Sequence, residues 1–142
     1  MQPIEILLVE DNPGDIRLTQ EVLKEGRICH HLNVMDDGEK AITFLKRTAR
    51  YVRSACPDLI LLDLNLPRRS GLEVLKMIKT SEALKHIPVI IFTSSQAEED
   101  IMSAYNLYAN CYITKPIDLA QFTKSIKSIE DFWFSVVQLP SE

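Results

Sequence analysis

Short runs of apolar residues alternate along this chain with longer segments in which apolar residues recur every three or four positions. The short runs predict strands, and the two most continuous are DLILLD at Asp58–Asp63 and PVIIFT at Pro88–Thr93. Both are apolar at consecutive positions, which is typical of parallel strands whose two faces are covered. The other predicted strands are Ile4–Val9, Leu32–Met35 and Asn110–Thr114.

Segments with helical periodicity follow each predicted strand. Asn12–Pro13 predicts one helix start, because Asn caps a helix and the first helical position does not need the N–H that Pro lacks. Arg47–Pro57 is basic and irregular, so we expect a helix end and a loop there. The last helix is expected to begin near Asp118. The residues expected to face the core are Leu18, Val22 and Leu23, then Ala41, Ile42 and Leu45, then Leu72, Leu75 and Ile78, then Ile101, Ala104 and Tyr105, and finally Phe122, Ile126, Ile129 and Trp133.

Five strands that alternate with five helices predict an α/β fold. The expected architecture is a doubly wound, parallel, five-stranded sheet of the flavodoxin-like (βα)5 class, with right-handed crossovers. A chain of 142 residues fits one domain with one core. We therefore expect residues 1–142 to form a single domain, with 134–142 as an apolar C-terminal extension.

The charge balance and the cysteines narrow the class of function. The formal net charge is −4, which argues against direct nucleic-acid binding because phosphate backbones need clustered Lys and Arg. No apolar run approaches the roughly 18 residues of a membrane span, and we expect no signal peptide. Cys29, Cys56 and Cys111 match no disulfide or zinc spacing. Reduced thiols in a cytoplasmic protein are the expectation.

Polar residues gather at the predicted carboxyl ends of the strands, where open α/β sheets bind ligands. In chain order they are Glu10 and Asp11 after the first strand, Asp63 at the end of the third, Thr93 at the end of the fourth, and Lys115 after the fifth. A carboxylate that ends an apolar strand is costly without a partner. The joint placement of these residues at one edge therefore favours a functional site over a chance arrangement.

Three carboxylates this close repel one another, so they either take up protons or hold a cation. Oxygen ligands without His or Cys suit Mg²⁺ or Mn²⁺. We expect Asp11 and Asp63 to coordinate the ion, with Glu10 acting through water. Asp63 is then the nucleophile that accepts a phosphoryl group. Lys115 and the hydroxyl of Thr93 are expected to contact phosphoryl oxygens.

The set Glu10–Asp11, Asp63, Thr93 and Lys115–Pro116 resembles the signature of response-regulator receiver domains of two-component systems. The resemblance runs from about Ile4 to Trp133, and it implies that a histidine kinase or phosphotransfer protein phosphorylates Asp63. The phrases LVEDNPGD and LILLDLNLPRRSG and the terminal FW pair are similar to small stand-alone receivers paired with bacterial phytochromes. The narrower resemblance implies a light-regulated histidine kinase as the upstream partner.

The resemblance also implies roles for neighbouring residues. The backbone carbonyl of Asn65 would be a further metal ligand, and Asn65 and Ser95 would tune dephosphorylation. Tyr112 matches the aromatic residue that moves inward with the Thr hydroxyl and reports phosphorylation. The Lys115–Pro116 bond would be cis, which X–Pro bonds tolerate. The chain departs from the common pattern in carrying Glu10 where Asp is usual.

The C-terminal residues are more apolar than one helical face can bury. Those in excess are Phe132, Phe134, Val136, Val137 and Leu139. They either fold back on the domain or form a surface for a partner. We predict a homodimer built with the last strand, the last two helices and this tail.

Two other functions share the fold or the nucleophile. A small phosphotransferase with an Asp nucleophile usually carries a second acid two residues later, where this chain has Asn65. A flavodoxin-like FMN module needs hydroxyls and glycines in its first loop, whereas the acidic loop EDNPGD would repel a phosphate. A phosphoacceptor switch that is not an enzyme, with a sensor histidine kinase as its partner, is the preferred interpretation.

Overall fold

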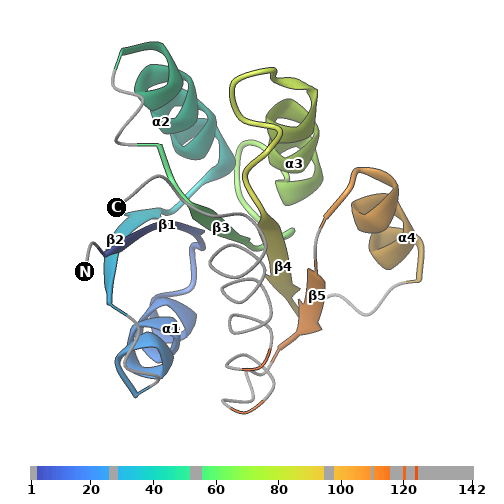
Figure 1. Ribbon diagram of the computed structural model, residues 1–142. Coiled ribbons are helices and arrows are strands. Elements are labelled where there is room, and N and C mark those ends of the chain that lie inside the picture. The colour runs from blue at the N-terminus through green and yellow to red at the C-terminus, as the bar shows by residue number, and fades with distance from the viewer. Residues whose placement is uncertain are drawn as a thin grey trace.

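A single parallel sheet forms the centre of the protein. The computed structural model describes residues 3–25, 29–51, 56–94, 98–109 and 111–115, together with Ala120 and Lys124. The strands run in the order β2-β1-β3-β4-β5, and all neighbours are parallel (Figure 1). Their bounds are β1 (Ile4–Val9), β2 (His30–Met35), β3 (Leu59–Leu62), β4 (Val89–Thr93) and β5 (Cys111–Thr114). The predicted flavodoxin-like class is confirmed.

Helices cover both faces of this sheet, as Figure 1 shows. Their bounds are α1 (Pro13–Glu25), α2 (Gly38–Tyr51), α3 (Gly71–Thr80) and α4 (Glu98–Asn106). Alternate residues of β3 enter different cores: Ile60 and Leu62 pack with residues of α2, α3 and α4, whereas Leu59 and Leu61 pack with residues of α1. Both faces are apolar because both are covered, which explains the continuous hydrophobic run in the sequence.

Helix α1 begins at Pro13, as predicted, but two details of the helix prediction are wrong. Leu18 is 39% exposed, and the neighbouring Thr19 of α1 is buried instead. Burial of Thr19 is tolerated because its hydroxyl donates to the backbone carbonyl of Asp15 over 2.9 Å. Tyr105 is 48% exposed, since the inward face of α4 is centred on Ala104. Helix α2 ends at Tyr51, within the Arg47–Pro57 segment where a helix end was expected.

Other expectations lie partly or wholly outside the described residues. Only Ala120 and Lys124 of the predicted last helix are described, and both are helical. Cys29 is exposed and Cys56 is half-buried, and both are free thiols. Within the described ranges, no helix is both long and apolar enough to cross a membrane.

Helix α3 begins directly against the backbone of Asp63. Ser70 caps this helix and forms a capping box with Glu73. A Cβ atom on Gly71 would lie 2.2 Å from the carbonyl oxygen of Asp63 and 2.5 Å from the Cα of Leu64. The absence of a side chain at Gly71 therefore lets α3 hold the segment that presents Asp63.

Replacing Gly71 by Ala is expected to lower the free energy of unfolding by about 1–3 kcal/mol, because the added methyl group meets backbone that cannot rotate away. Urea unfolding followed by circular dichroism measures the effect. Gly14→Ala is the matched control, since a Cβ there would approach only the side-chain oxygen of Asn12, at 3.2 Å. Equal stability of the two variants would contradict the close packing described for Gly71.

Candidate functional site

The fold brings the described carboxylates, Thr93 and Lys115 to one edge of the sheet, at the carboxyl ends of the strands. The residues directly after β1, β3 and β5 each donate their backbone N–H to an adjacent strand of the sheet, which fixes where their side chains begin. These bonds run from Glu10 to Met35, from Asp63 to Val9 and from Lys115 to Thr93, over 3.0, 3.0 and 2.8 Å. The sheet itself therefore positions the side chains.

Three carboxylates lie together at this edge. Glu10 and Asp63 are 1% and 5% exposed, whereas Asp11 is exposed. One oxygen from each lies within 4.8 Å of the others, a spacing that a single metal ion can bridge. The donors are all carboxylate oxygens, which suit a hard divalent cation. The residues present thus fit the metal that the sequence predicts.

Glu10 is the most deeply buried of the three carboxylates. Burial, with the negative charge of Asp63 adding to it, raises the pKa of the Glu10 carboxyl to about 7, although the hydrogen bond from Lys115 opposes this shift. The other oxygen of Glu10 accepts the backbone N–H of Asn12 over 3.2 Å. A cation at this position favours the charged form of Glu10.

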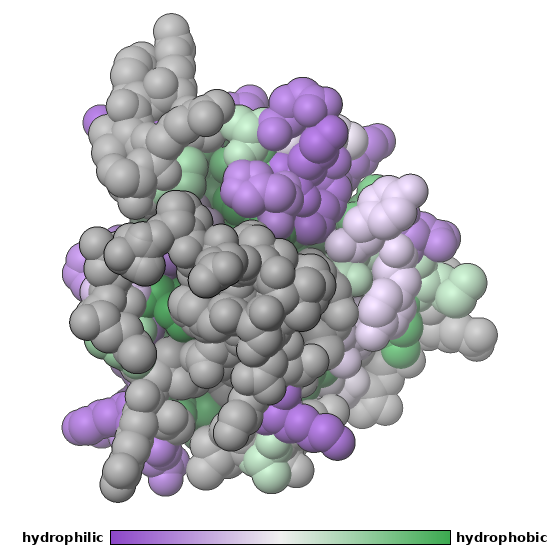
Figure 2. Space-filling view, in the orientation of Figure 1, coloured by the Kyte–Doolittle hydropathy of each residue, from purple (hydrophilic) through white to green (hydrophobic). Residues whose placement is uncertain are grey.

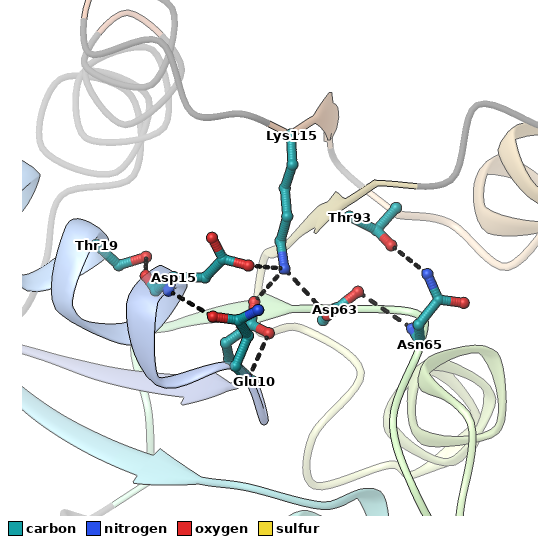
Figure 3. A network of polar contacts seen from close by, with 8 residues as sticks. Glu10, Asp15, Thr19, Asp63, Asn65, Thr93 and Lys115 are labelled. Carbon is teal, nitrogen blue, oxygen red and sulfur yellow. Dashed lines mark hydrogen bonds and ion pairs between the residues drawn. The ribbon is translucent and has the colours of Figure 1, made fainter.

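Lys115 reaches from the end of β5 to the carboxylates (Figure 3). Its Nζ lies 2.7 Å from Glu10 Oε1, 2.7 Å from Asp15 Oδ2 and 3.2 Å from Asp63 Oδ2. Burial lowers the pKa of Lys115, but the hydrogen bonds to Asp15 and Glu10 and the charge of Asp63 outweigh it and raise the pKa above its usual value. The Nζ also lies 5.6 Å from the ring centroid of Phe92. Lys115 is therefore a cation at neutral pH.

Asn65 connects Asp63 to Thr93. Its backbone N–H donates to Asp63 Oδ1 over 3.1 Å, and its side-chain amide donates to Thr93 Oγ1 over 3.2 Å (Figure 3). Thr93 is fully buried at the end of β4. The Thr93 hydroxyl, which is predicted to contact a phosphoryl group, is thus joined to the Asp63 carboxylate through one residue, by its backbone and its side chain.

Tyr112 lies in β5 beside Ile91 of β4 and is half-buried. Its ring centroid lies 6.5 Å from that of Tyr105 in α4, and the ring planes are tilted by 37°. A movement of Tyr112 would therefore change the surroundings of Tyr105 on the exposed face of α4. The switch role of Tyr112 stays a prediction.

Asp15 is a member of this site that the sequence pattern did not indicate. An acidic residue in the first turn of a helix has an ordinary explanation, since it interacts favourably with the helix dipole. The signal that could have identified Asp15 is the buried lysine, which needs several acceptors.

Some predicted residues lie outside the described ranges. The tuning role of Ser95, the cis peptide bond and the partner surface of the tail therefore stay predictions. The residues concerned are Ser95, Pro116, Phe132, Phe134, Val136, Val137 and Leu139.

The chain belongs to the response regulator receiver domain family, whose sequence profile matches residues 6–127. It is a phosphoacceptor switch of the two-component type rather than an enzyme in the ordinary sense. The family membership sets aside the FMN module and the phosphotransferase as alternatives.

Known proteins similar to this chain match it over nearly its whole length. Response regulator Rcp1 of Synechocystis sp. is 48% identical over 139 residues, which are 98% of this chain and 95% of that protein. The structure of the phosphorylated cyanobacterial phytochrome response regulator RcpA has 46% identity and a TM-score of 0.79, covering 98% and 99% of the two chains. The Mn²⁺-bound form of Rcp1 has 47% identity and the same TM-score, covering 98% and 100%. This metal-bound relative and the acidic cluster together suggest that the chain binds a divalent cation.

Proposed function

We propose that this protein is a stand-alone response regulator, one receiver domain over residues 1–142, that accepts a phosphoryl group on Asp63 from a phytochrome-type histidine kinase in the cytoplasm. The observation that carries this proposal is the position of Asp63. One oxygen of its buried carboxylate accepts a hydrogen bond from Lys115, and the other accepts one from the backbone N–H of Asn65. Carboxylate oxygens of Glu10 and Asp11 lie within 4.8 Å of an oxygen of Asp63. A buried nucleophile with a fixed cation beside it suits phosphoryl transfer.

The residues of the site divide the chemistry between them. An oxygen of Asp63 attacks the phosphorus in line, the bond from phosphorus to the donor atom breaks, and an acyl phosphate forms. Lys115 and the Thr93 hydroxyl contact the phosphoryl oxygens. Asp11, Asp63, the Asn65 carbonyl and, through water, Glu10 would hold Mg²⁺ or Mn²⁺, which would supply positive charge against the repulsion between the carboxylate and the phosphodonor. Because Asp63, Lys115 and Thr93 all belong to the chain, we expect a small phosphodonor to suffice once the metal ion is supplied.

Tyr112 is the proposed reporter of phosphorylation. When Thr93 turns its hydroxyl to the phosphoryl group, space opens behind it, and the Tyr112 ring moves inward. The contact between Tyr112 and Tyr105 then changes, which alters the face of α4. Phosphorylation thereby shifts the populations of two conformations. Hydrolysis of the acyl phosphate, at a rate tuned by Asn65 and Ser95, returns the protein to the first.

The kinase partner is proposed from the relatives, which include response regulators of phytochromes. Phosphotransfer from purified, autophosphorylated sensor kinases tests it, with phytochrome-type and unrelated kinases side by side. We expect transfer within seconds from a phytochrome-type kinase, and much slower transfer from the others. If no kinase transfers its phosphoryl group to wild-type protein, the proposed function is wrong. Equal rates from all of them would contradict only the phytochrome pairing.

Divalent metal is expected to raise the midpoint of thermal unfolding, because Mg²⁺ reduces the repulsion among the clustered carboxylates. Asp11→Asn should weaken the apparent affinity for Mg²⁺ roughly tenfold or more. Since Asp11 is exposed, its replacement should leave the metal-free stability nearly unchanged. Asp36→Asn, at another exposed carboxylate, is the control and should bind Mg²⁺ as the wild type does. An unchanged affinity in Asp11→Asn would rule out Asp11 as a ligand.

We also propose a homodimer that uses α4, β5 and the apolar tail. Met102, Tyr105 and Tyr108 are exposed on α4 and just after it. Figure 2 shows strongly hydrophilic atoms over α3, whereas the atoms over α4 at the right edge are paler and less polar. Exposed apolar side chains that gather in this way mark interaction surfaces.

Met102→Glu is expected to weaken self-association, because it buries a charge in the proposed interface. Leu18→Glu is the matched control, since Leu18 is exposed on α1, away from α4. Sedimentation velocity well above micromolar concentration, with and without acetyl phosphate, measures the dimer. A strict monomer in both conditions would contradict the proposal.

A further inference from the structure

Lys115 is shared among three carboxylates. An ammonium group has three N–H donors, and Nζ has three acceptors, which are Glu10 Oε1, Asp15 Oδ2 and Asp63 Oδ2. The lysine side chain is only 12% exposed. To contact a phosphoryl oxygen on Asp63, Lys115 must therefore weaken at least one of these three contacts.

Asp15 is the most replaceable of the three acceptors. Its side chain is 29% exposed, against 1% for Glu10 and 6% for Asp63, so water can solvate the Asp15 carboxylate after it loses the lysine. The cap of α1 uses the backbone N–H of Asp15, which donates to Asn12 Oδ1 over 3.1 Å. The Asp15 carboxylate is therefore not needed for this cap.

The contact with Asp15 is nevertheless a short one. It spans 2.7 Å, whereas Lys115 lies 3.2 Å from Asp63 (Figure 3). The ammonium group of Lys115 thus lies closer to the Asp15 carboxylate, on α1, than to the carboxylate of Asp63, the proposed phosphoryl acceptor. The negative charge of Asp15 beside Nζ also repels any anion that arrives at Asp63.

We propose that Asp15 is a positioning residue that competes with the phosphoryl group for Lys115 and thereby limits the stability of the phosphorylated state. This inference rests on the proposed function, in which Asp63 carries the phosphoryl group. When Asp63 is phosphorylated, Lys115 exchanges the Asp15 carboxylate for a phosphoryl oxygen, and Asp15 becomes hydrated. When the phosphoryl group leaves, Asp15 takes the ammonium group back.

The test measures the affinity for beryllofluoride, which adds to an Asp carboxylate as an analogue of the acyl phosphate. Isothermal titration calorimetry at saturating Mg²⁺ removes differences in metal affinity. We expect Asp15→Asn to bind beryllofluoride about three- to fivefold more tightly than the wild type. Asp15→Glu, which keeps the charge, should return the affinity toward the wild-type value.

Two further variants separate competition for Lys115 from other effects. Glu82→Gln removes one negative charge from the exposed Glu82–Lys85 pair, outside the site, and should leave the affinity unchanged. In a Lys115→Ala background, Asp15→Asn should no longer raise the affinity, because the group that Asp15 competes for is gone. A merely structural role for Asp15 would not depend on Lys115.

The outcomes distinguish the inference from the proposed function. If wild-type protein does not bind beryllofluoride at all, the proposed function fails, and the inference fails with it. If the wild type binds it but Asp15→Asn binds equally or more weakly, only the role of Asp15 is overturned. An increase that persists in the Lys115→Ala background overturns it as well, since Asp15 would then act through general repulsion.

Discussion

Asp63→Asn is expected to abolish covalent labelling by acetyl phosphate completely. An amide oxygen does not attack phosphorus under these conditions, whereas the carboxylate does. Asn has the size of Asp, and its oxygen can still accept the backbone N–H of Asn65, which spans 3.1 Å in the wild type. The variant should therefore fold normally and fail only in the chemistry. Intact-protein mass spectrometry after incubation with acetyl phosphate and Mg²⁺ measures the label.

The matched control for this variant is Asp36→Asn. Asp36 is an exposed carboxylate that pairs with Lys40 over 2.9 Å and takes no part in the site. The control should label to the wild-type extent, which shows that one lost carboxylate does not by itself prevent labelling. An acid-stable label that persists on Asp63→Asn would disprove the assignment of Asp63 as the acceptor.

Lys115→Ala is expected to lower the free energy of unfolding by about 3 kcal/mol in metal-free buffer. The variant leaves Glu10 and Asp63 buried without their cation, and removing one partner of a buried ion pair is strongly destabilising. Mg²⁺ should recover a larger part of the stability in the variant than it adds to the wild type, because the ion replaces the missing positive charge. Urea unfolding with EDTA and then with Mg²⁺ gives both quantities.

Labelling by acetyl phosphate should survive in Lys115→Ala, because Asp63 and the proposed metal ligands remain. The label should no longer change self-association, since the group that responds to the phosphoryl oxygen is missing. Lys40→Ala is the control for the loss of a lysine, as Lys40 forms an exposed pair with Asp36. Wild-type stability of Lys115→Ala in EDTA, or a normal response of its dimer to labelling, would contradict the role given to Lys115.

The fold could be predicted from the sequence because the buried strands carry an unambiguous pattern. Leu59–Leu62 and Val89–Thr93 are buried at every position, and a strand with both faces covered has few other interpretations. The strand bounds from the sequence differ from those in the structure by at most two residues. It is harder to predict from the sequence which side chains of a helix face inward. Thr19, for example, can take the place of an apolar residue because its hydroxyl donates to a backbone carbonyl.

Three of the predicted site residues share one property, which is that the sheet fixes their backbone. Glu10, Asp63 and Lys115 each follow a strand and bond to its neighbour, so their positions follow from the topology alone. The contact of Asp15 with Lys115 and the link from Asn65 to Thr93 depend instead on the side-chain conformations of residues far apart in the chain. Periodicity contains no information on such contacts, and only the structure supplied them.

The ion pair between Asp15 and Lys115 joins residues one hundred positions apart. During synthesis, Asp63 leaves the ribosome long before β5 and Lys115 have been made. A nascent chain thus contains the acceptor aspartate but not the cation beside it, and long-range contacts of this kind form late in folding. Only a chain that has closed its sheet at β5 has the complete site. An unfinished or truncated receiver would therefore contain the acceptor aspartate but lack the lysine that responds to the phosphoryl group.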